Sequence, residues 1–205
     1  MMNTRDKILD KALEMFNERG IEYVGLRELA AVLGIRVGNI TYYFPTKDDL
    51  VYELSQELSK KNSEIIVADT DLTMRAFLDM LHRVFQNHLQ FRCLLLSFVH
   101  VMAQNKLVAA SYKKTQSIRS ATMKSNIEAL TASGYLKVKD EAEMDFLVST
   151  LALISRFWIS EAAISFRQWS GEAQIRHYLS LVAKLLLPYA TPKAQRDIQD
   201  FLKTL

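Results

Sequence analysis

Four side chains that can hydrogen-bond to nucleic acid stand close together between residues 36 and 42. They are Arg36, Asn39, Thr41 and Tyr42, within the segment LGIRVGNITYYF. Arg and Asn can form paired hydrogen bonds with the base edges of guanine and adenine, and hydroxyl groups can bond to phosphate oxygens. On one short helix these residues would share an outward face. The segment therefore predicts a surface that enters the major groove of DNA.

The spacing around this segment is that of a helix-turn-helix. Gly34 follows the small residue Ala30 by four positions, and the apolar residue Ile40 follows Ala30 by ten. In such a motif a small residue stands where the helices cross, glycine makes a left-handed turn, and an apolar residue anchors the second helix. We expect these helices over about 26–34 and 37–44.

A further helix is expected to begin directly after the motif. In the segment PTKDDL, Thr46 is placed to cap a helix, and Asp49 stands three residues later, which is the spacing of a capping box. The helix is expected to reach Ile66. Because it crosses the boundary that we expect near residue 50, it would connect two parts of the chain mechanically.

The composition predicts an all-α protein. The 205 residues are 49% hydrophobic, with 6 Gly and 3 Pro, and apolar residues recur at spacings of three and four. The single cysteine, Cys93, excludes an intramolecular disulfide and a Cys-rich zinc site. A net charge of +3 neither requires nor excludes a polyanionic partner. Besides those above, we expect helices over about 3–19, 72–88, 91–104, 106–132, 140–168, 171–189 and 192–205.

The run from Thr4 to Leu54 resembles the N-terminal domain of the tetracycline-repressor (TetR) family of bacterial regulators. The matching segments are FNERG, LRELAAVLGI, GNITYYF and PTKDDL. The resemblance implies a three-helix DNA-binding domain over residues 1–50 and a larger helical ligand-binding and dimerisation domain over 51–205. It also implies that Lys47 lies beside a DNA phosphate. The predicted DNA-binding residues are Arg36, Val37, Gly38, Asn39, Thr41, Tyr42, Tyr43 and Lys47.

The charge of the N-terminal part is mixed. Residues 1–60 contain eight basic and ten acidic side chains, whereas residues 29–47 contain Arg36 and Lys47 and no acid. The surface that faces DNA can therefore be positive although the domain is slightly acidic. Because few phosphates would be contacted, we expect a modest salt dependence of DNA binding per subunit.

A DNA-binding domain of this size makes few base contacts. We therefore expect two copies to bind a palindromic operator, with their recognition helices roughly 34 Å apart. The helices over 140–168 and 171–189 carry apolar residues on more than one face, which suits a symmetric four-helix interface. Each of these residues could instead belong to the core of its own chain. The candidate interface residues are Trp158, Ala162, Ser165, Trp169, Leu179, Val182 and Leu186.

The helix expected over 91–104 carries a polar line, formed by Cys93, Ser97, His100 and Gln104, which either faces solvent or lines a cavity. Members of the TetR family generally bind an inducer among their central helices, and we expect a largely apolar small molecule here. The candidate pocket residues, any of which could be ordinary core, are Phe77, Phe85, His88, Phe98, His100, Met102 and Phe157.

Other classes of function find little support. The four histidines show no i, i+4 ligand pairing, and no nucleophile elbow, phosphate loop or dinucleotide motif is present, so we expect no metal, no cofactor and no enzyme activity. The charged N-terminus does not read as a secretory signal, and the apolar stretch around CLLLSFVHVMA is too short to span a bilayer. We expect a cytoplasmic protein without a membrane partner.

The sequence is thus interpreted as a ligand-responsive transcriptional regulator, a repressor that a small-molecule effector releases from its operator. Two alternatives stay open. The chain could be a helical small-molecule-binding protein whose N-terminal motif does not read DNA. It could also be a helical enzyme with a hydrophobic pocket that uses His88 or His100.

Overall fold

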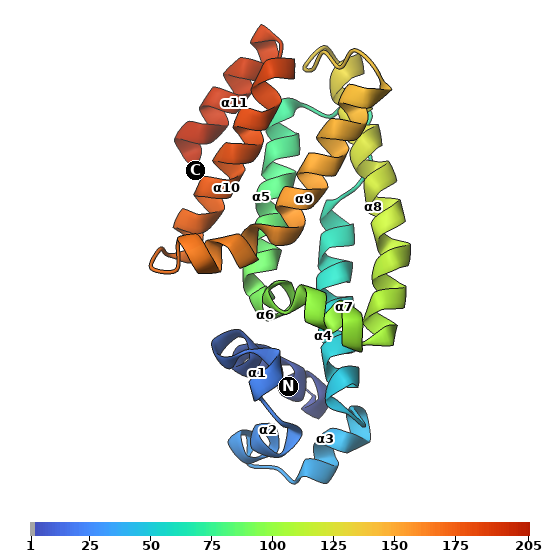
Figure 1. Cartoon of the computed structure of the whole chain (residues 1–205), viewed down its shortest axis with the longest axis vertical. Helices are drawn as coiled ribbons and strands as arrows, with labels where there is room; N and C mark the ends of the chain where they lie inside the picture. Colours follow the sequence, from blue (N-terminus) through green and yellow to red (C-terminus); the bar gives the residue numbers. More distant parts are fainter. Residues whose placement is uncertain (1–2) are drawn as a thin grey trace. The chain divides into compact units, whose positions relative to one another are not determined.

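The computed structural model describes residues 3–205, and these confirm the predicted all-α fold. Within this range the chain forms eleven α-helices and two short 3-10 helices, and its extended pairing is limited to one isolated bridge, between Leu136 and Ala190 (Figure 1). The α-helices are α1 (Thr4–Arg19), α2 (Leu26–Leu33), α3 (Val37–Tyr43), α4 (Lys47–Ile65), α5 (Met74–Gln90), α6 (Arg92–Leu96), α7 (Phe98–Gln104), α8 (Lys106–Ala132), α9 (Glu141–Ser165), α10 (Gly171–Leu186) and α11 (Pro192–Thr204). The 3-10 helices are η1 (Ile21–Tyr23) and η2 (Leu187–Tyr189).

The described chain packs into two compact units. The first holds residues up to 61 together with 90–114, and the second holds residues 62–89 and 115–205. Helices α4, α5 and α8 each continue from one unit into the other without a break. The division by packing therefore differs from the functional boundary near residue 50, which stays a prediction.

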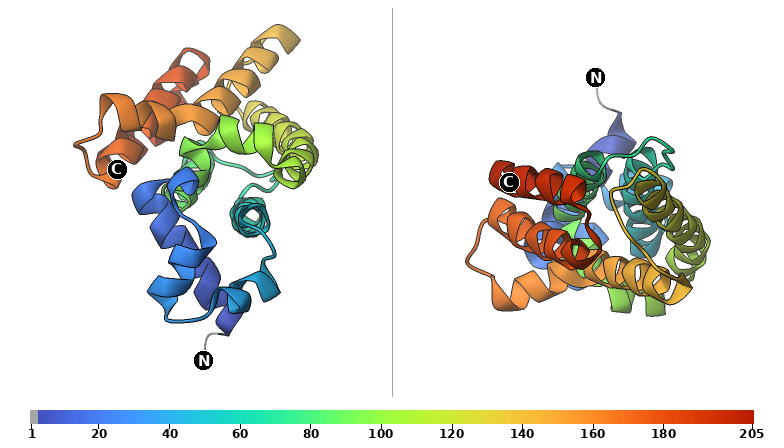
Figure 2. Two further views of the ribbon diagram at one scale, coloured as in Figure 1. Left: turned by 60° about the horizontal axis from the view of Figure 1, so that its bottom comes forward. Right: turned by 90° about the horizontal axis from the view of Figure 1, so that it is seen from above.

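The first unit is built on the apolar face of α1. Ile8, Ala12 and Phe16 recur at helical spacing and are buried, and α1 packs against α2, α3 and α6 (Figure 2). Two ion pairs hold the outside of this arrangement, Arg5 with Glu53 of α4 and Arg19 with Glu28 of α2. These helices support the turn between α2 and α3.

The second unit is built around α5. Its predicted inward face is confirmed, since Phe77, Leu81, Val84, Phe85 and His88 are all buried. Helix α10 packs between α9 and α11, as the ribbons in Figures 1 and 2 show. Trp158 of α9 and Asp197 of α11 both hydrogen-bond to α5, so helices distant in sequence contact it.

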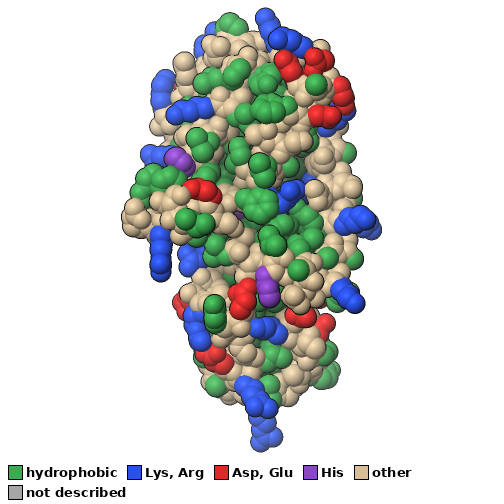
Figure 3. All heavy atoms as spheres, viewed as in Figure 1, with side chains coloured by type: hydrophobic (Ala, Val, Ile, Leu, Met, Phe, Trp, Pro, Cys, Tyr) green, Lys and Arg blue, Asp and Glu red, His purple; other side chains and the backbone are tan. Residues whose placement is uncertain are grey.

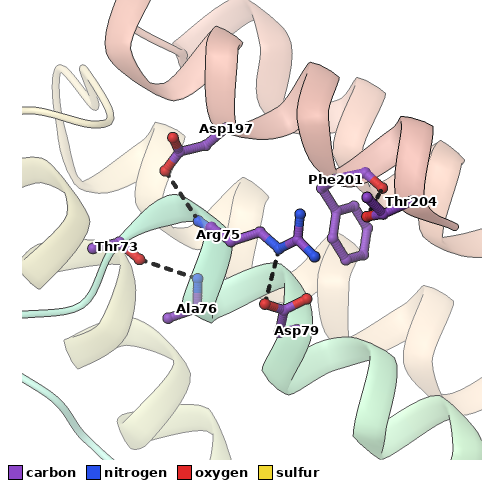
Figure 4. Close-up of polar contacts among 7 residues, drawn as sticks. All are labelled: Thr73, Arg75, Ala76, Asp79, Asp197, Phe201 and Thr204. Atoms are coloured by element: carbon purple, nitrogen blue, oxygen red, sulfur yellow. Dashed lines mark hydrogen bonds and ion pairs between the residues drawn. The ribbon is translucent and has the colours of Figure 1, made fainter.

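Helix α11 closes the N-terminal end of α5 (Figure 4). The carboxylate of Asp197 accepts a hydrogen bond from the backbone N–H of Arg75 at 3.2 Å, and Arg75 Nε donates to Asp79 at 2.9 Å. The Arg75 guanidinium also lies over the Phe201 ring, 5.4 Å from its centroid. An acid at the first turn of a helix satisfies a backbone donor that has no intrahelical partner.

Two helix boundaries differ from the prediction. The single helix expected over 91–104 is broken at Ser97, whose backbone leaves helical geometry at φ −90°, ψ 15°. The Ser97 hydroxyl bonds to the Glu22 carboxylate, a contact from far away in sequence that favours the break. The helix expected over 171–189 ends at Leu186, because Pro188 lacks the N–H that would continue it.

Candidate DNA-binding surface and buried polar cluster

The turn between α2 and α3 has the predicted left-handed glycine. Gly34 adopts φ 66° and ψ 28°, and its N–H donates to the carbonyl of Ala31 at 3.1 Å. The N–H of Ile35 donates to the carbonyl of Ala30 at 3.0 Å, so the last carbonyls of α2 are satisfied inside the turn. The helix-turn-helix geometry expected from the sequence is therefore present.

Helix α3 is anchored by apolar side chains and exposes its polar ones. Ile40 within the helix and Phe44 directly after it are buried. Tyr42 is 80% exposed and Tyr43 40% exposed, and their rings meet edge to face at 4.9 Å. The predicted residues that lie exposed on this surface are Arg36, Val37, Gly38, Asn39, Thr41, Tyr42 and Tyr43. Their contact with DNA stays a prediction.

Lys47 differs from the other predicted DNA-binding residues because it is half-buried. Its ammonium donates to the backbone carbonyl of Ile21 at 2.9 Å and to that of Glu22 at 3.4 Å. Lys47 thus ties the start of α4 to the 3-10 helix η1. Two of its three protons are used in this way, and its contact with a DNA phosphate stays a prediction.

The start of α4 is held by the predicted capping box. The N–H of Asp49 donates to the Thr46 hydroxyl at 3.2 Å, and the N–H of Thr46 donates back to the Asp49 carboxylate at 2.9 Å. The reciprocal bonds satisfy two backbone donors at the end that follows α3. These bonds confirm the capping box that the spacing of Thr46 and Asp49 predicted.

A second joint of the first unit was not predicted. The side chain of Asn17, near the end of α1, donates to the carbonyl of Gln90 at 2.8 Å and accepts from the N–H of Cys93 at 3.0 Å. The Arg92 guanidinium donates to the Asn17 carbonyl at 2.7 Å. The segment from Gln90 to Cys93 is therefore hydrogen-bonded to the end of α1.

A buried polar cluster lies in the second unit, around His88 of α5. The indole N–H of Trp158 donates to Nδ1 of His88 at 3.3 Å, and Nε2 faces the side-chain amide of Asn62 at 3.3 Å. Nδ2 of Asn87 donates a hydrogen bond to Oδ1 of Asn62 at 3.0 Å. The cluster links α9, α5 and the end of α4.

The protonation state of His88 follows from its partners. An indole N–H can only donate, so Nδ1 is an acceptor, and a neutral imidazole then carries its proton on Nε2. In the structure Asn62 Nδ2 faces Nε2 and Asn62 Oδ1 accepts from Asn87, so an acceptor reaches the Nε2 proton only when both amides are turned over together. Burial, together with the charge of Arg119, lowers the pKa of His88 from 6.5 to about 3. His88 is therefore neutral at physiological pH.

Aromatic rings continue from this cluster toward the surface. Phe85 stacks on Trp158 with ring centroids 4.9 Å apart and planes within 5° of parallel. Trp158 contacts Tyr178 at 5.6 Å, and Tyr178 contacts His177 at 5.0 Å. Beyond them, Phe166 stacks on the partly exposed Trp169 at 4.2 Å. The rings form a continuous series between α5, α9 and α10.

The structure brings together only some of the predicted pocket residues. Phe85 and His88 are in this cluster, and Phe77 is buried two turns earlier on α5. Phe98, His100 and Met102 belong to α7 in the first unit, and Phe157 is half-buried on α9. His100 is exposed, as is Gln104, and a role of His100 in a pocket stays a prediction. The polar line over 93–104 thus runs from the buried Cys93 to the exposed His100 and Gln104.

Most of the predicted interface residues are inside the chain. Because a side chain enclosed by its own subunit offers no surface to a partner, the prediction was wrong for five of them, namely Trp158, Ala162, Leu179, Val182 and Leu186. Ser165 and Trp169 are exposed. The apolar surface of α9 is instead carried by Phe146, Leu153 and Ile164, and that of α10 by Leu181. Figure 3 shows hydrophobic side chains over these two helices on the face in view.

Two groups of the cluster were missed by the sequence analysis. Asn62 lies in a polar stretch of α4, and only its position opposite His88 gives it significance. Tyr178 lies within an apolar helix, where the sequence pattern predicts a core residue.

Cys93 is buried, and burial raises the pKa of its thiol to about 12, so the thiol is unreactive. Among residues 3–205, no three His, Cys, Asp or Glu side chains gather as metal ligands would.

Family sequence models match almost the whole chain. The model described as bacterial regulatory proteins of the tetR family matches residues 8–54, and the model of the bacterial transcriptional repressor TetR matches residues 53–198. The two matches meet within α4.

Curated relatives match over shorter stretches. The probable HTH-type transcriptional regulator YttP of Bacillus subtilis is 32% identical over 65 residues, which are 32% of this chain and 31% of that protein. The regulator AcrR of Shigella flexneri is 41% identical over 59 residues, 29% of this chain and 27% of that one. The chain thus aligns with about a third of each relative's length.

Solved structures share the whole fold. A TetR-family transcriptional regulator from Marinobacter aquaeolei superposes with a TM-score of 0.89 at 22% identity, covering 99% of this chain and 98% of that one. A complex of SmeT with triclosan superposes with a TM-score of 0.64 at 14% identity, covering 93% of both chains. At these identities the likeness establishes the fold.

Proposed function

Since the chain belongs to the TetR family of bacterial transcriptional regulators, we propose that it represses transcription as a homodimer, which a small-molecule effector releases from a palindromic DNA operator. Residues 1–50 would read DNA, and residues 51–205 would dimerise and bind the effector. In this role the protein is cytoplasmic and has no catalytic activity.

The observation that carries the proposal is the division of α3 into a buried anchor and an exposed polar face. Ile40 fixes the helix against its own unit, while Arg36, Asn39 and Tyr42 are left outside. These three side chains can reach base edges and phosphates from one helix laid in the major groove. Tyr42, which is 80% exposed at the end of α3, is open to such a contact.

The requirement for two copies is supported by α9. By length and composition a segment of α9 could cross a membrane, with a mean hydropathy of 1.4, and only 28% of it is buried within the chain. Its exposed apolar residues Phe146, Leu153 and Ile164 leave this helix without a partner on one side. Pairing with the same helix of a second copy would remove that surface from water.

The buried polar cluster supports a route from effector to DNA. Asn62 lies in the last turns of α4, and the same helix begins at the capping box of Thr46 directly after α3. A ligand that displaces Trp158 or His88 would break the bonds that hold Asn62, and α4 would change its position. The extent of release is limited by how much better the effector binds one state than the other.

The alternative to this function is a helical ligand-binding protein that no longer reads DNA. It is supported by the slightly acidic N-terminal region and by the ion pairs that occupy Arg5 and Arg19. The repressor and the alternative differ in one measurable property, which is whether the protein selects a DNA sequence.

The experiment is selection from random duplex DNA at low salt, followed by fluorescence anisotropy on the enriched sequence. We expect a palindrome whose half-site centres are about 10 base pairs, one turn, apart. Absence of any enriched sequence would favour the alternative.

A further inference from the structure

The buried side chain of Asn105 joins two helices at the junction between α7 and α8. It is 4% exposed, and its Oδ1 accepts a hydrogen bond from the N–H of Val108 at 3.0 Å, which caps the start of α8. Because that bond identifies the side-chain oxygen, Nδ2 is the atom that donates to the carbonyl of Asp48 at 2.8 Å. Asp48 lies in the first turn of α4. Asn105 therefore ties that turn to the start of α8.

Helix α7 is held at its other end as well. It begins after Ser97, whose hydroxyl bonds to the carboxylate of Glu22 in η1. Lys47, the first residue of α4, donates to the backbone carbonyls of Ile21 and Glu22. These bonds close a ring, which runs from η1 through α7 and Asn105 to the start of α4 and back to η1. All of its members belong to the first unit.

The start of α4 is thereby fixed to α8. Further along the two helices, Nε2 of Gln56 donates to the Ser111 hydroxyl at 2.9 Å, so α4 and α8 run in the same direction and are bonded twice within the first unit. Only the three residues 44–46 separate α3 from α4. A change in the position of the first turn of α4 would therefore also change the position of α3.

We propose that Asn105 is a positioning residue for DNA recognition, which holds α3 in the orientation that a single half-site spacing requires. The inference rests on the proposed function, since it names a residue that sets the operator spacing. Inserting one base pair moves two half-sites about 3.4 Å further apart and turns one of them by about 35°. A dimer with a fixed α3 rejects that change, whereas a dimer with a loosened α3 adapts to it.

Two substitutions open the ring at opposite ends of α7. In Asn105→Ser the hydroxyl can still cap α8, but it is too short to reach the carbonyl of Asp48, so the bond to α4 is lost. Ser97→Ala removes the bond to Glu22 at a half-buried position.

The matched control is Asn126→Ser. Asn126 is fully buried in the second unit, and its amide donates to the backbone carbonyl of Val67 at 3.1 Å, so this variant loses a bond of the same kind away from α7.

Fluorescence anisotropy measures the affinity for the selected operator and for duplexes with one base pair inserted or removed between the half-sites. The wild type and Asn126→Ser should bind the altered duplexes at least tenfold more weakly than the operator. In Asn105→Ser and in Ser97→Ala this ratio should fall about fivefold, which is the value of one neutral hydrogen bond. An unchanged ratio in Asn105→Ser, or an equal fall in Asn126→Ser, would overturn the inference. If Asn105→Ser does not fold, the ratio in Ser97→Ala decides.

Hydrogen–deuterium exchange of the DNA-free proteins keeps the two proposals apart. The backbone amides of residues 50–54 in α4 should exchange faster in Asn105→Ser than in the wild type, and Asn126→Ser should leave their exchange unchanged. If exchange rises in this way but the wild type selects no DNA, the proposed function fails while Asn105 still positions α4. If the wild type binds its operator and neither the ratio nor the exchange changes in Asn105→Ser, only the role of Asn105 is wrong.

Discussion

The indole N–H of Trp158 and Nδ1 of His88 are joined by a hydrogen bond of 3.3 Å in the interior of the second unit. Because the indole can only donate, the bond exists only while the imidazole is neutral. A proton on Nδ1 would place two donors against each other and a charge in an apolar interior. The stability of the chain should therefore depend on the protonation of His88.

This dependence has a definite sign. The pKa of His88 is lowered to about 3 in the folded chain from 6.5, so between these values the unfolded chain binds a proton that the folded chain does not. Stability is then lost as the pH falls below about 6.5. Between pH 7 and pH 5 this single group should cost about 2 kcal/mol.

The measurement is urea unfolding of the wild type and of His88→Gln at both pH values. The loss on acidification should be about 2 kcal/mol smaller in His88→Gln, whose side chain does not titrate. His100→Gln removes an exposed imidazole and is the matched control. Equal losses in wild type and His88→Gln would show that His88 is not the group responsible.

Substitution of Arg36 should weaken DNA binding without affecting the fold. Arg36→Ala removes an exposed charge at the start of α3, so the affinity should fall and the slope of log affinity against log salt should decrease by about 1 per subunit. Anisotropy at several salt concentrations measures both quantities. Arg196→Ala, on the exposed side of α11, should change neither. An unchanged affinity and slope would remove Arg36 from the DNA surface.

The two glycines near α3 should respond in opposite directions to the same substitution. Gly34 has φ 66° and open space around its Cβ position, so Gly34→Ala should destabilise the first unit by about 1 kcal/mol through backbone strain alone. Gly38 lies inside α3, also with open space, and Gly38→Ala should stabilise it by roughly 0.5–1 kcal/mol. Thermal unfolding of both variants checks this. Equal shifts would contradict the left-handed turn.

Leu153 should be essential for pairing of two chains. Leu153→Glu places a charge in the exposed apolar face of α9, and a buried unpaired carboxylate at an interface costs several kcal/mol. The variant should sediment as a folded single chain. Leu107→Glu alters an equally exposed leucine on α8 and should remain paired. A Leu153→Glu protein that still pairs would place the interface elsewhere.

Local sequence signals predicted the N-terminal part well. Gly34, Ile40 and the Thr46–Asp49 capping box act within a few residues, so their spacing alone specifies the turn, the anchor and the next helix. The break at Ser97 was not predictable in this way. Its partner Glu22 is distant in sequence, and helical periodicity continues through the break.

The choice of buried face was the least predictable feature. Helices α9 and α10 are apolar on several sides, so the pattern could not say that Trp158 and Leu179 face their own chain while Leu153 and Leu181 face outward. That choice depends on which helices pack against them. The roles of Asn62 and Asn105 likewise depend on partners that only the folded chain defines.

The most direct test of the account is the number of chains bound to a selected operator. Sedimentation of the wild-type protein with a labelled palindromic duplex, and with a duplex in which one half-site is scrambled, measures that number. Two chains should bind the palindrome together, and the single half-site should bind far more weakly. One chain on the palindrome with equal affinity for the half-site, or no complex with any selected duplex at low salt, would contradict it.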